Sequence, residues 1–247
     1  AGLITVVPRP GIRGSQKLCG IRASCVTLDL FAHTSQPVHK PPLFVNMPIG
    51  HYSNCEIHPP CGIVSVTEYL SQEDSPYGFY SPEHTDAALL WFTWGYLEYQ
   101  FSNYPLLQDK VSRIEFSFEI CSEAPGYNNN WPSDIALEMN RQRITTILIK
   151  GDYGGRKGIY NPSWWSDSVT QFGEYRKICV THEGCYMDNT KVSNETIESL
   201  GLLENYFFTF TLRVDPDSEH VGGMNLFGSR FGDYAQDIIM KVEYENS

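Results

Sequence analysis

Three segments of the chain gather the residue types that proteins use to bind polar organic ligands. They are residues 121–140 (CSEAPGYNNNWPSDIALEMN), 150–167 (KGDYGGRKGIYNPSWWSD) and 222–237 (GGMNLFGSRFGDYAQD). A flat aromatic ring covers the C–H face of a sugar, while Asn, Asp, Glu and Arg side chains pair with its hydroxyls. Glycines let the backbone approach a ligand closely. We therefore expect a preformed pocket, with the candidate ligand-binding residues Glu119, Trp131, Asp134, Asn140, Asp152, Arg156, Trp164, Trp165 and Asn225.

Each candidate also has a purely structural interpretation. Tryptophans pack in cores, and Asn and Gly occupy tight turns without contacting any ligand. We favour the ligand interpretation for the three segments taken together, because a stable β-protein does not require so many polar groups beside rings. Trp131, Asp134 and Arg156 rank highest, since a ring, an acceptor and a planar donor fork are complementary tools for binding a polyol.

Catalysis by these segments would need a defined geometry. A glycosidase places two carboxylates at a fixed separation, and the sequence offers many, at Glu115, Glu119, Glu123, Asp134, Glu138 and Asp152. The sequence does not bring any particular pair together. It also lacks the G-x-S-x-G, H-E-x-x-H, P-loop and G-x-G-x-x-G motifs of other chemistries. We predict a binding protein rather than an enzyme, with no cofactor.

The cysteines favour reduced thiols over disulfides or metal ligands. Their number, 7, is odd, and the chain is large enough to fold without covalent crosslinks. Two cysteines six positions apart on one strand are separated by about 20 Å, too far to bridge. This spacing recurs in Cys19/Cys25, Cys55/Cys61 and Cys179/Cys185, although a hairpin at CVTHEGC would bring its two ends together. No C-x2-C motif accompanies the possible soft ligands, so we predict no metal site at His51, Cys55, His58 and Cys61.

The elements that must position these side chains are predicted to be β-strands. Apolar residues alternate with polar ones over 114–120 (IEFSFEI), 205–214 (NYFFTFTLRV) and 237–244 (DIIMKVEY), and 88–101 is a long apolar run. Alternation of this kind indicates a strand with one buried face. Only 194–202 (NETIESLGL) has a helical character. We therefore predict an all-β fold, a two-sheet antiparallel β-sandwich of the jelly-roll type.

The N-terminal residues differ from the rest in charge. The 247-residue chain carries 18 Lys and Arg against 29 Asp and Glu, yet residues 1–28 contain four cations and no acid. Two apolar runs around a Pro- and Gly-rich turn predict a β-hairpin there. The remainder, with 14 cations and 29 anions, would repel nucleic acid. We expect a hairpin at 1–32, a linker or extended arm at 33–42 and the sandwich at 43–247.

The sequence resembles the C-terminal part of bacterial ArsR-like winged-helix transcription regulators. The likeness spans about residues 43–244 and rests on SFEICSEAPGYNNNWPSDIALEMN, GDYGGRKGIYNPSWW, TQFGEYRKICVTHEG and HVGGMNLFGSRFGDYAQDIIM. It implies a β-rich effector region after a DNA-binding module, whose wing would be the basic hairpin. Arg9, Arg13 and Lys17 would then contact phosphates. The helices that precede the wing in that group and its metal-sensing cysteine motif have no counterpart here, so we expect no metal response.

The resemblance implies a sensor. We expect the sandwich to bind a polar small molecule, plausibly a saccharide, and to modulate the binding of DNA by an intact winged-helix dimer. Such a switch needs a ligand that prefers one of the two states. A carbohydrate-binding module or lectin is the first alternative, and a glycoside-processing enzyme is the second. No apolar stretch is long enough to span a bilayer, and we expect a cytoplasmic homodimer.

Overall fold

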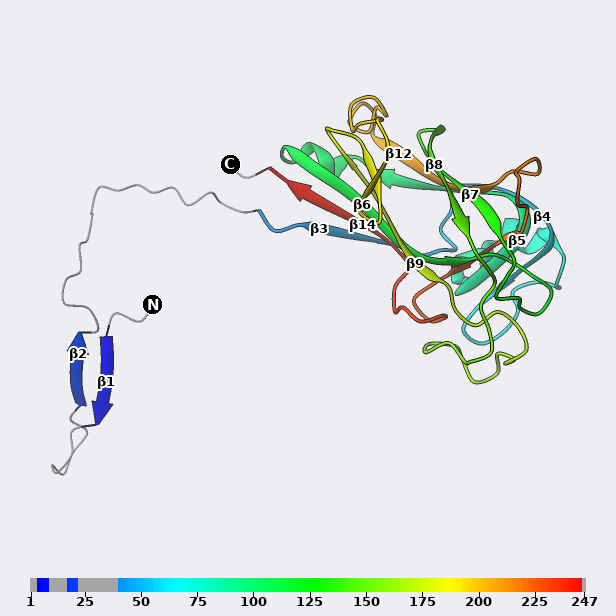
Figure 1. Ribbon diagram of the computed structural model, residues 1–247, viewed down its shortest axis with the longest axis horizontal. Coiled ribbons are helices and arrows are strands. Elements are labelled where there is room, and N and C mark those ends of the chain that lie inside the picture. The colour runs from blue at the N-terminus through cyan, green and yellow to red at the C-terminus, as the bar shows by residue number, and fades with distance from the viewer. Residues whose placement is uncertain (1–3, 9–16, 22–39, 246–247) are drawn as a thin grey trace. The chain divides into compact units, whose positions relative to one another are not determined.

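The structure is a computed structural model that describes residues 4–8, 17–21 and 40–245. The chain divides into two compact units, Ala1–Val38 and His39–Ser247. In the first unit, β1 (Ile4–Pro8) pairs antiparallel with β2 (Lys17–Ile21) (Figure 1). Arg9 and Arg13 lie outside the described residues, and Lys17 is the first residue of β2. The interpretation of this hairpin as a wing stays a prediction.

The second unit consists of two layers of antiparallel strands (Figure 1). Sheet A contains, in spatial order, β3 (Leu43–Met47), β14 (Ile238–Tyr244), β6 (Val111–Cys121), β9 (Glu174–Thr181), β10 (Cys185–Met187) and β11 (Thr190–Ser193). Sheet B contains β4 (Asn54–Val64), β5 (Leu89–Ser102), β12 (Phe207–Val214), β7 (Ser133–Met139) and β8 (Gln142–Ile149). The short strand β13 (Met224–Phe227) pairs with both β5 and β6 and joins the two sheets.

The order of these strands is that of a jelly roll. Numbered along the chain, the eight principal strands are β3, β5, β6, β7, β8, β9, β12 and β14. One layer then contains the first, last, third and sixth of these strands side by side (β3, β14, β6, β9), and the other contains the second, seventh, fourth and fifth (β5, β12, β7, β8). This is the arrangement of two interlocked Greek keys. The predicted fold class is therefore confirmed. The strands β4, β10, β11 and β13 extend this framework.

The core lies between the two layers and is rich in phenylalanine. Phe116 of β6 stacks on Phe210 of β12 with ring centroids 4.6 Å apart, and it meets Phe101 of β5 edge-on at 5.1 Å. The predicted inward positions of 114–120 and 238–244 are all buried. The pattern over 205–214 holds from Phe208 onward, but Tyr206 precedes the strand and is 93% exposed.

A glycine marks the point where β5 changes partners. Residues Leu89–Phe92 of β5 pair with β13, and residues 95–102 pair with β12. Gly95 has a φ of 126°, and a Cβ there would lie 1.9 Å from the carbonyl oxygen of Glu56. Only glycine fits such a position. Before this point Leu89 to Phe92 are all buried, whereas after it buried Leu97, Tyr99 and Phe101 alternate with less buried residues, so β5 changes from burial on both faces to burial mainly on one.

The predicted helical character of 194–202 is wrong, because this segment forms consecutive turns. Gly201, at a φ of 61°, departs from the helical backbone conformation and interrupts any regular helix. The helices that do occur among the described residues are three short 3-10 helices, each with proline in its first turn: η1 (Pro76–Tyr80), η2 (Pro82–Asp86) and η3 (Tyr104–Leu107). None of the described helices has the length and apolarity that a membrane span requires.

Candidate functional site

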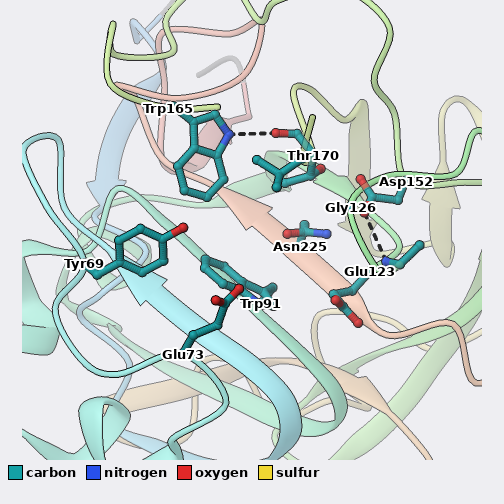
Figure 2. Close-up of a pocket in the computed structure, with 11 residues that line it drawn as sticks. Tyr69, Glu73, Trp91, Glu123, Gly126, Asp152, Trp165, Thr170 and Asn225 are labelled. Atoms are coloured by element: carbon teal, nitrogen blue, oxygen red, sulfur yellow. Dashed lines mark hydrogen bonds between the residues drawn. The ribbon is translucent and has the colours of Figure 1, made fainter. Parts of the chain in front are cut away.

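A cleft opens where β13 joins the two sheets. Its floor is formed by cross-strand neighbours, Asn225 of β13 beside Trp91 of β5. Three loops form its walls: the loop after β4 supplies Tyr69 and Glu73, the loop after β6 supplies Glu123, Ala124 and Gly126, and the long connection from β8 to β9 supplies Asp152, Trp165, Val169 and Thr170. In Figure 2 the side chain of Asn225 lies between the two indole rings on one side and Glu123 and Asp152 on the other, and Glu73 lies beside Trp91.

Three aromatic rings line one side of the cleft. Trp91 and Trp165 are buried, with ring centroids 6.1 Å apart, and Tyr69 lies 6.4 Å from Trp91 and 6.0 Å from Trp165. Trp164 extends the cluster outward, 5.7 Å from Tyr69. The indole N–H of Trp165 donates to the carbonyl of Thr170 at 2.8 Å (Figure 2). Tyr69 and Trp164 are partly exposed and lie against the buried ring of Trp165, with their own ring planes 58° apart; we call this pair the platform at the mouth.

The position of Trp91 depends on a glycine on the neighbouring strand. Gly62 of β4 lies directly opposite Trp91 in the register. A Cβ at Gly62 would lie 2.2 Å from the indole ring, far inside van der Waals contact. The indole therefore lies flat against the backbone of β4, and a larger residue at position 62 would push it into the cleft.

Two carboxyl groups face the aromatic side. Burial, together with the negative charges of Asp152, Asp74 and Glu73, raises the pKa of Glu123 from 4.5 to about 7. Burial raises the pKa of Asp152 from 3.8 to about 6, while hydrogen bonds from Thr170 and from the backbone N–H of Ala124 oppose this change. The Ala124 bond is 3.0 Å long (Figure 2). Near neutral pH, Glu123 can therefore serve as either a hydrogen-bond donor or an acceptor.

Glu123 differs from Asp152 in having no hydrogen-bond partner. Asp152 accepts from Ala124 and from the thiol of Cys121, whereas no described residue donates to the carboxyl of Glu123. A buried polar group without a partner costs free energy unless water or a ligand satisfies it. The side-chain nitrogen of Asn225 donates to the carbonyl of Ser122 at 2.7 Å, which fixes the amide and leaves its oxygen unpaired among the described residues.

The interior of the cleft is small. Its volume of about 50 Å³ accommodates one or two groups of the size of water or hydroxymethyl. A larger ligand would therefore rest on the platform at the mouth and insert only a small polar substituent.

The cleft brings together three of the predicted ligand-binding residues, Asp152, Trp165 and Asn225, with Trp164 beside them. The three that ranked highest do not line it. Trp131 is partly exposed, and its backbone N–H donates to the carbonyl of Lys150. Asp134 accepts from the backbone and the ring of His220, at 3.0 and 3.3 Å. Arg156 forms a two-pronged ion pair with Asp233 and covers the ring of Phe172.

The remaining two predicted residues, Glu119 and Asn140, form hydrogen bonds within the protein and do not line the cleft. Glu119 is fully buried and accepts hydrogen bonds from the backbone N–H groups of Gly173, Asp233 and Tyr234. Burial raises its pKa to about 7, while these donors oppose the change. Asn140, with a φ of 46°, occupies a turn and ties it to the carbonyl of Leu200 at 2.8 Å.

The prediction missed Tyr69, Glu73 and Trp91 and named Glu123 only as one of several carboxylates. Trp91 lies in a long apolar run, where a tryptophan is indistinguishable from core. Its cross-strand neighbours, Gly62 and Asn225, come from distant parts of the chain. The signal for Glu123 was its place directly after an alternating strand, at the start of an Asn- and Gly-rich loop.

In the part of the chain that spans residues 40–245, the cysteines and the other metal-ligating residue types form no metal-binding site. Cys55, Cys61, Cys121, Cys179 and Cys185 are free. Within residues 40–245 no group of three or more His, Cys, Asp or Glu is arranged to hold a metal ion.

Comparison with known proteins leaves the family open. No family model matches the chain, and no curated protein matches it. Among solved structures, it is similar to the CBM36-1 domain of a multidomain xylanase from the hindgut metagenome of Trinervitermes trinervoides, at a TM-score of 0.35 and 9% identity over 84% of this chain and 100% of that one. It is also similar to the C-terminal CBM6 of LamC, a marine laminarinase from Zobellia galactanivorans, at 0.32 and 8% over 82% and 100%.

A third structure is the family 7 alginate lyase A1-II′, with a TM-score of 0.28 and 12% identity over 81% of this chain and 96% of that one. TM-scores this low do not establish a shared fold, so the jelly-roll assignment rests on the strand order of this chain. The class that fold and site define is a β-jelly roll with an aromatic and carboxyl-lined cleft between its loops.

Proposed function

We propose that the unit spanning residues 39–247 binds a saccharide at the cleft without transforming it. The observation that carries the proposal is the meeting of an aromatic platform with an unpaired carboxyl group and an unpaired amide oxygen. The sugar ring lies on Tyr69 and Trp164, and a hydroxyl-bearing substituent enters the small interior toward Glu123 and Asn225. Rings contribute C–H contacts, and buried polar groups select hydroxyls.

Two tryptophans offer a matched test of this site. Trp164 and Trp131 are exposed to nearly the same extent, 37% and 38%, but only Trp164 belongs to the aromatic cluster of the cleft. A panel of methyl glycosides and linear hexasaccharides should contain a ligand that raises the melting temperature, because ligands that bind only the folded state stabilise it. We expect Trp164→Ala to weaken this ligand about tenfold, a stacking loss of about 1.4 kcal/mol, and Trp131→Ala to leave its affinity unchanged.

The opposite result would assign the ligand to a different site. If Trp131→Ala abolished binding and Trp164→Ala did not, the ligand would lie at the residues that ranked highest from the sequence. A panel without any stabilising glycoside would reject the saccharide proposal.

We further propose that this module is the sensor region of a transcription regulator, on the strength of the sequence resemblance and of the separate N-terminal hairpin. The protein extended upstream should bind duplex DNA with an affinity that falls steeply with salt. Arg13→Ala should weaken binding on all sequences alike, since phosphate contacts carry no sequence information. Binding that is absent, or independent of salt, would reject this role.

A glycoside-processing activity is the second candidate, and the pKa of Glu123 favours it. A carboxyl group among aromatic rings that keeps its proton near neutral pH is suited to protonating a leaving glycosidic oxygen. The two candidates differ in one experiment on any saccharide that binds. Release of new reducing ends that Glu123→Gln abolishes while binding persists would show catalysis; binding without release of reducing ends would show a module that only binds.

A further inference from the structure

A second cavity lies on the outer face of sheet B, away from the residues of the cleft. Its volume is about 330 Å³, and its lining consists of Asn54, Tyr96, Glu98, Glu138, Arg141 and Arg213. The strand register explains this grouping. Thr211 of β12 lies opposite Glu98 of β5 on one side and opposite Glu138 of β7 on the other. Side chains of directly opposed residues share a face of the sheet, so these three form a row across it.

Glu98 is the unusual member of this row. The residue is only 9% exposed, yet no described residue donates a hydrogen bond to its carboxylate. Its nearest cation is the Nε of Arg141, 3.9 Å away, on a side chain that is itself largely exposed. Buried carboxylates in proteins are normally paired and hydrogen-bonded. The cavity therefore presents a carboxylate that has little exposed surface and is short of donors.

The hydroxyl of Thr211 is unpaired as well. Thr211 is 2% exposed, and its Oγ1 has no partner among the described residues. Glu138, on the other side of the row, contrasts with both: its carboxylate lies 3.3 Å from Arg143 and 3.3 Å from Arg213. The arginines nearest to the row thus pair mainly with Glu138, and Glu98 is left without a hydrogen-bond donor among the described residues.

The charge of the lining indicates the kind of ligand. Two carboxylates, Glu98 and Glu138, are balanced by two guanidinium groups, Arg141 and Arg213, so the cavity does not favour a cation or an anion. It offers strong acceptors and planar donors side by side. A neutral molecule with adjacent hydroxyls satisfies both at once, since each hydroxyl donates to a carboxylate and accepts from a guanidinium.

We infer that this cavity is a second polyol-binding site, which takes a neutral sugar unit through hydrogen bonds to Glu98 and the flanking arginines. It goes beyond the proposed function of the cleft, because it uses different side chains and contains no free aromatic platform: the Arg213 guanidinium covers the ring of Tyr96 at 4.5 Å. Recognition here is polar, whereas recognition at the cleft combines rings with polar groups. One module would then hold two points of a saccharide, or two saccharides.

The test follows backbone amide signals of the 1–247 chain during titration with methyl β-xyloside, methyl β-glucoside and methyl α-mannoside. At least one probe should shift the amides of Tyr96, Thr211 and Arg213 in a saturable way. Glu98→Gln should raise the dissociation constant at these amides about tenfold, since hydrogen bonds to a charged group are the stronger kind. Thr211→Val should leave it unchanged without lowering the melting temperature, because the hydroxyl it removes is buried, does not line the cavity and has no partner among the described residues.

The variant Tyr69→Ala separates this site from the cleft. It should leave the shifts at Tyr96, Thr211 and Arg213 unchanged while it weakens binding at the cleft. The inference is overturned if no probe moves these amides, if Glu98→Gln leaves their titration unchanged, or if Tyr69→Ala abolishes it. Shifts at the sheet B amides alone would support this site and reject the cleft; shifts at the cleft alone would do the reverse.

Discussion

The replacement Glu123→Gln tests the electrostatics of the cleft directly. The folded protein holds the proton of Glu123 up to a pKa of about 7, whereas the unfolded chain releases it near 4.5. Between these values the folded state binds more protons than the unfolded state, so the free energy of unfolding falls as pH rises. The stabilising contribution is fully present below about pH 4.5 and is lost by about pH 7. Asp152, with a pKa of about 6, acts in the same direction.

The magnitude follows from the width of this window. Each pH unit corresponds to about 1.4 kcal/mol per proton, and partial exposure of Glu123 reduces the full value to on the order of 2 kcal/mol. Glutamine keeps the shape and does not titrate. We therefore expect Glu123→Gln to be more stable than the parent at pH 7.5 by about that amount, and to differ little from it at pH 4.5.

Urea unfolding between pH 4.5 and pH 8 measures this difference. The variant Glu73→Gln is a graded control. Of the three carboxylates whose negative charges raise the pKa of Glu123, Glu73 has the smallest effect. Its removal should slightly lessen the pH dependence of the free energy of unfolding and leave most of that dependence in place. A Glu123→Gln protein with the pH profile of the parent, or a parent whose stability rises from pH 5 to pH 7, would refute the reasoning.

Two further predictions concern packing, one beside the cleft and one in the core. Gly62→Ala should destabilise the fold by about 1–3 kcal/mol, since its Cβ would lie 2.2 Å from the Trp91 indole, and it should also change the tryptophan fluorescence of the folded state. Phe210→Ala should cost about 3–5 kcal/mol in urea unfolding, because its fully buried ring stacks on Phe116; a loss below 1 kcal/mol would contradict the assigned core.

The sequence was informative about strands because alternation is local. The burial of Ile114, Phe116, Phe118 and Ile120 follows from side chains alternating across one extended segment. The pairing of β13 with both β5 and β6 is not local. It decides which loops meet, and no periodicity within a strand encodes it.

The same distinction explains the candidate site. Loops rich in rings, Asn and Gly were predicted to bind a ligand, and Asp152, Trp165 and Asn225 do meet in one cleft. Asp134 and Arg156 have the same residue types, but each has a partner within the protein, in His220 and Asp233. Whether a polar side chain is free for a ligand depends on what lies beside it in space. Residue type and spacing do not contain that information.

The two proposed sites lie on either side of one irregularity in β5. Before Gly95, Leu89 to Phe92 are all buried, and Trp91 lies beside Asn225 of β13; after it, Leu97 and Tyr99 are buried, and Glu98 lies beside Thr211 of β12. Gly95 has a φ of 126°, and a Cβ there would lie 1.9 Å from the carbonyl oxygen of Glu56 on β4. Any other residue at position 95 would strain the backbone and push β4 away from β5. A replacement of Gly95 would therefore disturb the strand that supplies both Trp91 to the cleft and Glu98 to the cavity.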